Sequence, residues 1–157
     1  MYERIIFNEN LMTIHLFYID KPIYFLNNGI TMAKKLMVVD DDLYIRELYE
    51  EVLKDEGYTV DTASNGQEAY DKLKAGGYDI VLLDIMMPKL DGLGVMDALR
   101  KTEPPVKNGP IILLTNLDHD PLIKDAISKG AAAFIIKADI TPADLVTQVK
   151  KYLGETT

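Results

Sequence analysis

Short runs of consecutive apolar residues alternate along most of the chain with segments whose apolar residues recur every three or four positions. The runs predict strands buried on both faces, and the longer spacing predicts amphipathic helices. The expected strands are residues 36–39, 58–63, 80–83, 111–114 and 133–136. Residues 58–63 differ from the others, because apolar and polar residues alternate there and do not form one apolar run. The expected helices are residues 43–56, 67–75, 121–129, a segment around 95–100 and a final helix from residue 142.

Glycine and proline support these boundaries. Gly57 and Gly130 follow the last periodic residues of two helices, where a left-handed backbone conformation is common. Thr141 is suited to cap the final helix, and Pro142 fits its first position. Strands that alternate with helices in this way predict an α/β domain with a doubly wound parallel sheet and helices on both faces.

The first 33 residues differ in character from the rest, because they are rich in aromatic and branched apolar residues without a clear period. The sequence Met32-Ala33-Lys34-Lys35 also resembles a natural start. Three interpretations stay open: a stretch translated from a misplaced start, a flexible arm, or an additional strand or helix that docks on the domain. We favour the first two, and we expect residues 34–157 to form the domain itself.

Composition narrows the classes of function. The chain has 157 residues with 48% hydrophobic and 27% charged residues, which is typical of one globular domain. It contains no cysteine, which excludes disulfides and thiolate metal sites. A net charge of -8 disfavours direct contact with nucleic acid. The apolar stretch at residues 11–19 is shorter than the ~20 residues of a membrane span, so we expect a cytoplasmic protein without membrane insertion.

Polar side chains follow four of the expected strands at the point where each strand ends. They are the acidic run 40–42, then Asp84, Thr115 and Lys137. Because parallel strands place their carboxyl ends at one edge of the sheet, where ligands bind in α/β folds, we expect these side chains to converge.

These residue types suit the transfer of a phosphoryl group. Carboxylates that lie close together repel one another, and a hard divalent cation such as Mg²⁺ relieves this repulsion and bridges to phosphate oxygens. An aspartate can accept a phosphoryl group as an acyl phosphate. A lysine ammonium and a threonine hydroxyl can both donate hydrogen bonds to phosphate oxygens, and such transfer depends mainly on positioning and charge neutralisation.

Residues 35–153 resemble the receiver domain of bacterial two-component response regulators. The resemblance rests on four segments in order: Leu-Met-Val-Val-Asp-Asp at 36–41, Asp-Ile-Met-Met-Pro-Lys-Leu-Asp-Gly at 84–92, Ile-Ile-Leu-Leu-Thr at 111–115 and Phe-Ile-Ile-Lys at 134–137. Each segment is weakly specific, whereas all four at fitting intervals are a strong signal. The resemblance implies a flavodoxin-like fold with strand order 2-1-3-4-5.

The resemblance also implies roles for individual residues. Asp84 would be the phosphoacceptor and a metal ligand. Asp41 would bind Mg²⁺, or Mn²⁺ in its place, directly, whereas Asp40 would act mostly through other ligands. The backbone carbonyl of Met86 would be a further ligand. The register within the acidic run is open by one residue, and Asp42 is expected to cap the following helix.

Three further residues would couple phosphorylation to a response. Lys137 would pair with a phosphoryl oxygen, and Thr115 would bond the phosphoryl group and move toward it. Phe134 would be an aromatic switch, although a plain core role for it is equally open. The surface of the fourth helix, fifth strand and fifth helix would then be the readout.

The resemblance implies a sensor histidine kinase or a phosphotransfer protein as donor, a downstream protein as target, and an oligomeric state that phosphorylation can change. Because only a few residues follow the final helix, we expect a stand-alone receiver. Three departures leave the switching open. Asn116 stands where the family usually has a small residue, and Ala138 where it usually has a proline in a cis peptide. The run Ala-Ala-Ala at 131–133 replaces acidic residues that are often found there. A cis bond before a non-proline costs about 3 kcal/mol, so we predict a trans bond before Ala138.

Two other functions remain open. One is a pseudo-receiver, a binding module with this fold that never carries phosphate. The other is a small phosphohydrolase of the haloacid dehalogenase type, in which Asp40 would be the nucleophile of an Asp-x-Asp pair. The absence of the usual glycine and the small size of the chain count against the hydrolase.

Overall fold

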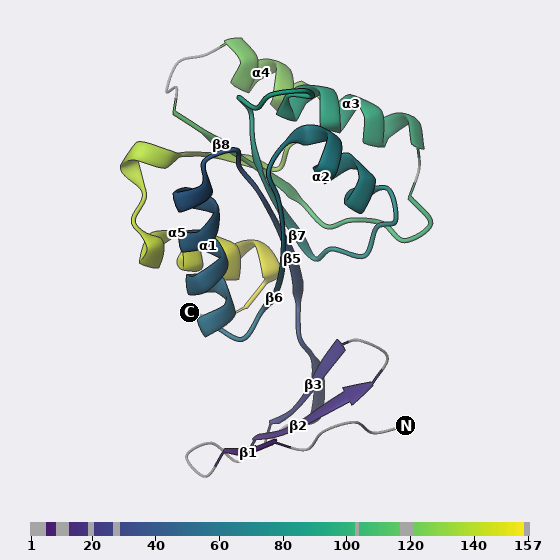
Figure 1. Cartoon of the computed structure of the whole chain (residues 1–157), viewed down its shortest axis with the longest axis vertical. Helices are drawn as coiled ribbons and strands as arrows, with labels where there is room; N and C mark the ends of the chain where they lie inside the picture. The colour runs from purple at the N-terminus through teal and green to yellow at the C-terminus, as the bar shows by residue number, and fades with distance from the viewer. Residues whose placement is uncertain are drawn as a thin grey trace.

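The computed structural model describes residues 6–8, 13–18, 21–26, 29–102, 104–116 and 121–155. This part of the chain contains a five-stranded parallel sheet and a four-stranded antiparallel sheet (Figure 1). The parallel sheet and its helices correspond to the predicted domain, and the antiparallel sheet belongs to the segment before it.

The parallel sheet has the predicted strands. They are β5 (Lys35–Val39), β6 (Thr59–Ala63), β7 (Ile80–Asp84), β8 (Ile111–Thr115) and β9 (Ala133–Ile136). Their spatial order is β6-β5-β7-β8-β9, which is 2-1-3-4-5 when these five strands are counted along the chain. The flavodoxin-like fold and its strand order are therefore confirmed. β7 and β8 extend one residue beyond the predicted ends, so Asp84 and Thr115 are themselves strand residues.

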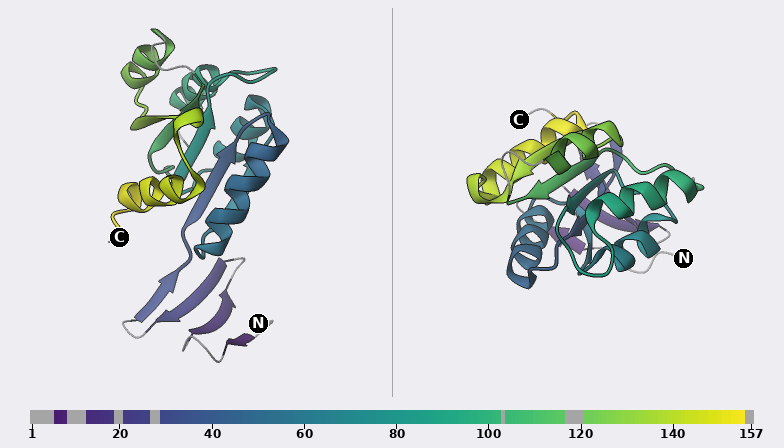
Figure 2. Two further views of the ribbon diagram at one scale, coloured as in Figure 1. Left: turned by 90° about the vertical axis from the view of Figure 1, so that its left-hand side faces the viewer. Right: turned by 90° about the horizontal axis from the view of Figure 1, so that it is seen from above.

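Helices cover both faces of this sheet. They are α1 (Leu43–Asp55), α2 (Gly66–Leu73), α3 (Gly92–Thr102), α4 (Pro121–Ser128) and α5 (Pro142–Leu153), with a short 3₁₀ turn η1 (Lys137–Asp139) after β9. Neighbouring strand residues point to opposite faces, so Leu82 packs with α1 and α5 while Leu83 packs with α2, α3 and α4. Figure 2 shows the two helical layers. All five residues of β7 are buried, as its apolar run predicts.

Side-chain caps fix where the helices begin. Asp42 is the N-cap of α1, as predicted, and its carboxylate accepts hydrogen bonds from the backbone N–H groups of Tyr44 and Ile45. Thr141 and Asp144 form a reciprocal capping box at α5, which satisfies backbone donors that the helix itself cannot pair. The cap at Asp42 matters for function, because it starts α1 directly after the acidic residues that end β5.

The start of β5 is attached to the loop before β7 by Asp79. The Asp79 carboxylate accepts a hydrogen bond from the Lys35 backbone N–H at 2.8 Å and pairs with the Lys34 ammonium at 3.1 Å. The Asp79 backbone N–H in turn donates to the Lys35 carbonyl at 2.7 Å. We refer to these contacts as the Asp79 clamp. They hold the amino-terminal end of β5 in register with its neighbour.

The segment before the clamp contains four antiparallel strands. They are β1 (Ile6–Asn8), β2 (Thr13–Tyr18), β3 (Lys21–Leu26) and β4 (Gly29–Met32), and consecutive strands pair with one another. The three interpretations of this segment that the sequence leaves open all remain predictions. The division of the chain at residue 33 remains a prediction.

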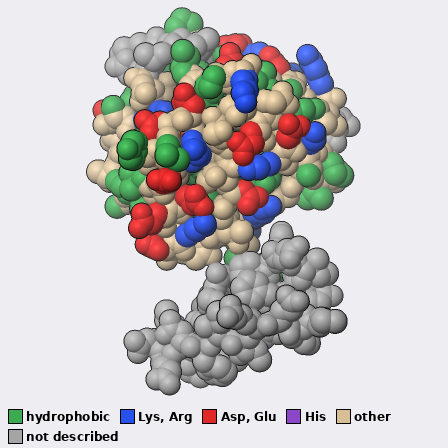
Figure 3. Space-filling model, viewed as in Figure 1, with side chains coloured by type: hydrophobic (Ala, Val, Ile, Leu, Met, Phe, Trp, Pro, Cys, Tyr) green, Lys and Arg blue, Asp and Glu red, His purple; other side chains and the backbone are tan. Residues whose placement is uncertain are grey.

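The surface of the parallel-sheet domain mixes charges of both signs. On the face seen in Figure 3, acidic and basic side chains are interspersed, and no continuous basic area is visible. Within the described residues, no helix combines the length and the apolar character that a membrane crossing requires.

Candidate functional site

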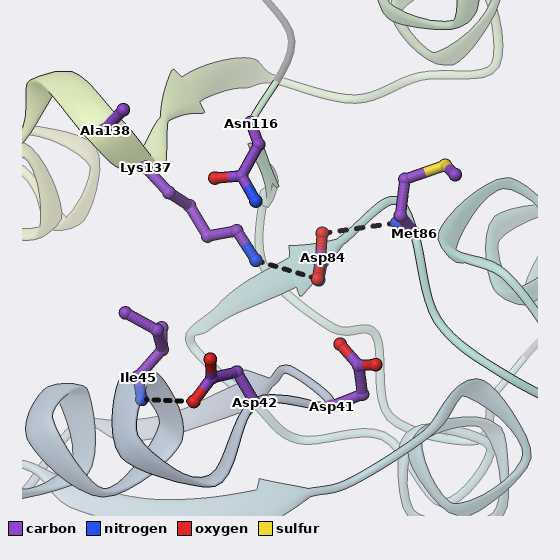
Figure 4. Close-up of a pocket in the computed structure, with 8 residues that line it drawn as sticks. All are labelled: Asp41, Asp42, Ile45, Asp84, Met86, Asn116, Lys137 and Ala138. Carbon is purple, nitrogen blue, oxygen red and sulfur yellow. Dashed lines mark hydrogen bonds and ion pairs between the residues drawn. The ribbon is translucent and has the colours of Figure 1, made fainter.

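The polar residues at the strand ends meet at the carboxyl edge of the parallel sheet. Asp40 and Asp41 follow β5, Asp84 ends β7 and Lys137 follows β9. Asp41, Asp84 and Lys137 line an open cavity of about 520 Å³ (Figure 4), and Asp40 is buried beside it. The residues that line it are Asp41, Asp42, Ile45, Asp84, Met86, Asn116, Lys137 and Ala138. The predicted convergence of these strand ends is therefore what the structure shows.

Lys137 is the central contact of the site. Its Nζ lies 2.8 Å from Oδ2 of Asp84 and 3.0 Å from Oδ2 of Asp40. All three groups are largely removed from water, with side-chain exposures of 8% for Lys137, 3% for Asp84 and 0% for Asp40. A buried charge is tolerated when it is paired and hydrogen-bonded, so each of these groups depends on the others.

The three acidic residues at this edge form a candidate site for a divalent cation. Asp40, Asp41 and Asp84 each offer a carboxylate oxygen, and these oxygens lie within 4.8 Å of one another. Oxygen ligands in this arrangement suit a hard cation such as Mg²⁺. Asp41 is exposed and makes no hydrogen bond or ion pair with another described residue, so both of its oxygens are available. The donor set therefore fits the expected ion.

Hydrogen bonds fix the backbone and the side chain of Asp40. Its backbone N–H donates to the Ala63 carbonyl at 3.2 Å, and its Oδ1 accepts from the Asp42 N–H at 3.0 Å. The Arg46 guanidinium donates to the Asp40 carbonyl at 2.7 Å. Sequence reasoning missed Arg46. The only signal for it is its place four residues after the Asp42 cap, on the turn of α1 that follows the acidic run.

Burial and charge shift the pKa of both buried partners. Burial raises the pKa of Asp84 above its usual value and the nearby negative charge of Asp40 adds to this, whereas Lys137 opposes it. Burial alone would lower the pKa of Lys137, but its contacts with Asp84 and Asp40 outweigh burial and raise it. Lys137 therefore stays charged and pairs with two carboxylates, while the third, Asp41, has no ion pair with a described residue. The excess of negative charge favours a divalent cation.

Comparison with known proteins agrees with this geometry. Residues 36–150 match the family described as the response regulator receiver domain. The chain belongs to this family. Receiver domains are regulatory signalling domains of two-component systems, and no enzyme family is indicated for the chain.

Individual relatives support the assignment to the receiver family. The chain is 35% identical over 125 residues to the transcriptional regulatory protein SrrA of Staphylococcus aureus. The aligned region covers 80% of this chain and 50% of SrrA. The chain thus spans about half the length of the curated relatives it matches. Among solved structures it is similar to the response regulator TrrA of Thermotoga maritima in complex with Mg²⁺-BeF, with 42% identity and a TM-score of 0.63 over 76% of this chain and 98% of that one.

A CheY-like receiver domain protein from Methanospirillum hungatei is a further structural neighbour. It is 27% identical to this chain with a TM-score of 0.70, and the match covers 78% of this chain and 94% of that one. The receiver fold thus extends across proteins with quite different sequences.

The remaining receiver residues lie around the cavity or behind it. The Met86 backbone N–H donates to Oδ1 of Asp84 at 3.2 Å, and its side chain is 59% exposed. Thr115 is buried at the end of β8, and the side chain of Asn116 after it lines the cavity instead. Phe134 is 43% exposed, which excludes the plain core role that the sequence leaves open for it.

The structure also places two of the residues that depart from the family pattern. The carboxamide of Asn116 points into the space between Lys137 and Asp84 (Figure 4). Ala138 lies in the 3₁₀ turn after β9 and lines the cavity beside Lys137. The peptide bond between Lys137 and Ala138 is trans, as predicted from the absence of proline.

Replacing Lys137 by methionine should destabilise the receiver. Without the ammonium group, Asp40 and Asp84 are buried and unpaired, so the free energy of unfolding at neutral pH should fall by about 3 kcal/mol. Burial already raises the pKa of Asp84 above its usual value, and losing Lys137 removes the group that opposes this rise, so the deficit should shrink as the pH falls and Asp84 becomes protonated. Urea unfolding with a metal chelator, at neutral and acidic pH, measures both effects.

The matched control is Lys124→Met, which removes an exposed lysine from α4. It should change stability by less than about 0.5 kcal/mol at either pH. A Lys137→Met variant with the same stability as this control would mean that Lys137 does not compensate the buried carboxylates.

Proposed function

We propose that this chain is a phosphoacceptor switch that receives a phosphoryl group on Asp84 in a Mg²⁺-dependent reaction. The observation that carries the proposal is the position of the Asp84 carboxylate, which lines an open cavity between the Lys137 ammonium and the acidic residues that follow β5. The donor would be a sensor histidine kinase or a phosphotransfer protein, and we place the reaction in the cytoplasm.

Asp41, Asp84 and the Met86 backbone carbonyl would hold the metal ion. Asp40 would support these ligands through its own hydrogen bonds. The ion supplies charge neutralisation at the phosphate oxygens, as is usual for phosphoryl transfer. Asp40 suits a supporting role, because one of its oxygens accepts from the Asp42 N–H and the other pairs with Lys137.

In the transfer step, an oxygen of Asp84 forms a bond to phosphorus while the bond between phosphorus and the donor breaks. The leaving group departs with the electron pair. Lys137, whose ammonium already lies 2.8 Å from the carboxylate, then pairs with a phosphoryl oxygen. Thr115 would donate its hydroxyl to another oxygen, which requires it to turn from its buried position toward the cavity.

The acyl phosphate on Asp84 would carry about -1.5 to -2 charges in place of the single negative charge of the carboxylate, and this added charge would drive the response. We propose that Thr115 moves toward the phosphoryl group and that Phe134 turns inward into the space it leaves. The surface formed by α4, β9 and α5 would change as a result. A downstream protein that reads this surface would be the target, and the oligomeric state can respond at the same surface.

The alternatives differ in which residue reacts. A hydrolase that uses Asp40 as nucleophile lacks support, because Asp40 is fully buried and does not line the cavity, whereas Asp84 does. The pseudo-receiver alternative rests on Asn116 and Ala138. It is weakened because the acidic residues and Lys137 have the geometry that phosphoryl transfer needs.

Incubation with acetyl phosphate and Mg²⁺ should add one phosphoryl group to the protein, because Asp84 is the accessible nucleophile of the site. Intact mass spectrometry measures the adduct, which should be absent in Asp84→Asn and in samples with a chelator. The control Asp55→Asn, an exposed position at the end of α1, should behave as the unchanged protein. An adduct on Asp84→Asn would contradict the assignment, and phosphate turnover lost in Asp40→Asn would favour the hydrolase.

The metal ligands can be separated by two neighbouring substitutions. Asp41→Asn removes a carboxylate with two available oxygens and should weaken Mg²⁺ binding about tenfold or more. Asp42→Asn should change binding by no more than about threefold, because asparagine caps a helix as well as aspartate does and Asp42 bonds to α1 instead. Titration calorimetry measures both. Equal losses in the two variants would mean that the register of the acidic run is different.

Phe134→Trp tests the switch directly, because the chain contains no tryptophan and the new residue would be its only one. A side chain that is 43% exposed before phosphorylation and turns inward afterwards should shift its emission to shorter wavelength. The same variant combined with Asp84→Asn is the control and should show no shift. An unchanged emission spectrum on fully phosphorylated protein would rule out the inward turn.

A further inference from the structure

Arg46 is the fourth residue of α1, and its side chain turns back toward the acidic residues that precede the helix. Helical side chains lean toward the helix N-terminus, so a long side chain at this position can reach the turn before the helix. The half-buried guanidinium donates to the Asp40 carbonyl at 2.7 Å, while the Arg46 backbone N–H donates to the Asp42 carbonyl at 3.0 Å. Arg46 therefore binds the segment 40–42 through both its backbone and its side chain.

The contact with Asp40 acts on Asp41 through the backbone. The carbonyl of Asp40 and the N–H of Asp41 belong to one planar peptide group, so a bond that fixes the carbonyl fixes this plane. The peptide group on the other side of Asp41 is held as well, because the Asp42 N–H donates to Oδ1 of Asp40 at 3.0 Å. Each of the two peptide groups that flank Asp41 is thus held by a side chain.

The direction of the Asp41 carboxylate decides whether it can serve as a metal ligand. It points toward Asp84 (Figure 4), and oxygens of Asp40, Asp41 and Asp84 lie within 4.8 Å of one another. The Asp41 side chain has no partner among the described residues, so its position depends on its rotamer and on the backbone that carries it. A ligand that is already directed toward the ion loses less freedom when the ion binds, which favours binding.

Other roles of an arginine at this position explain the contact less well. A cation is unfavourable near the positive end of a helix, so Arg46 does not stabilise α1 by its charge. No carboxylate in the described part of the chain forms an ion pair with it. Its charge also repels a cation that binds nearby, so by charge alone Arg46 would weaken the metal site.

We propose that Arg46 is a positioning residue of the metal site, which holds the peptide group before Asp41 and so directs this ligand toward the cation. The inference rests on the proposed Mg²⁺-dependent function and adds to it a residue that does not line the cavity. Positioning and charge have opposite effects on metal affinity, so the sign of the change in a variant separates them.

Arg46→Met removes the guanidinium and keeps an unbranched side chain. The dissociation constant for Mg²⁺ should rise about fivefold, because one of the two peptide groups beside Asp41 is released while the other stays held. Loss of charge alone would lower the constant instead. Arg46→Lys keeps the charge and a donor, and its constant should stay within about twofold of the unchanged protein. Titration calorimetry measures these constants.

A second measurement separates positioning from a general loss of structure. With acetyl phosphate at saturating Mg²⁺, the rate constant for phosphorylation of Arg46→Met should return to within about twofold of the unchanged protein, because the bound ion then holds Asp41 itself. Circular dichroism shows whether the variant is folded, and Arg46→Gln, which is also uncharged and too short for the bond, replaces it if it is not. The control Arg100→Met removes an exposed arginine from the last turn of α3 and should change neither quantity.

The proposal is overturned if Arg46→Met binds Mg²⁺ as tightly as the unchanged protein or more tightly, or if Arg46→Lys loses as much affinity as Arg46→Met. It is also overturned if saturating Mg²⁺ does not restore the rate constant. If the unchanged protein binds no Mg²⁺ or forms no adduct, the proposed function fails and this inference with it. If the unchanged protein does both and the variants contradict the expected pattern, only the inference fails.

Discussion

The site depends on one ammonium group that compensates two carboxylates in a place from which water is excluded. Asp40 and Asp84 come from different strands, and both are buried at the edge of the sheet. Lys137 reaches them from the 3₁₀ turn after β9, and its Nζ lies within 3.0 Å of an oxygen of each. Removing any one of the three side chains leaves an uncompensated charge in a poorly solvated place. The charge balance of the site therefore depends on the ends of three different strands. The compensation is incomplete, and this is what makes the edge attractive to a divalent cation.

The fold supports this arrangement through the central strand. β7 is buried along its whole length between two helical layers, so its last residue has little freedom to move away from the edge. Asp84 is therefore fixed by packing and Lys137 by its two ion pairs, whereas Asp41 and Asn116 on the cavity wall are exposed. In the proposed reaction, the rigid groups are those that would meet the phosphorus, whereas the exposed groups would meet the metal ion and the solvent. This division agrees with phosphoryl transfer, in which positioning supplies most of the catalysis.

Much of the fold could be predicted from the sequence, because a parallel strand buried on both faces has to be apolar throughout. The run before Asp84 is an example, and the acidic cap at Asp42 could be read from its place before a periodic segment. The register of the acidic run 40–42 could not be predicted, because all three residues are aspartates. Only the structure separates buried Asp40 from exposed Asp41. Arg46 was missed because it contacts a backbone carbonyl, and its place four residues after the Asp42 cap is too weak a signal to single it out. The exposure of Phe134 depends on packing around β9, which its short apolar run does not reveal.

The Asp79 clamp has a consequence for the rest of the molecule. It ties the first residue of β5 to the loop that leads into β7, at the end of the sheet opposite the cavity (Figure 1). A force applied to whatever precedes Lys34 is therefore carried by two neighbouring strands at once, and does not pull β5 alone past its partners. A tag or a fused protein attached ahead of the clamp would hang from the far side of the domain and leave the cavity open to a docking partner.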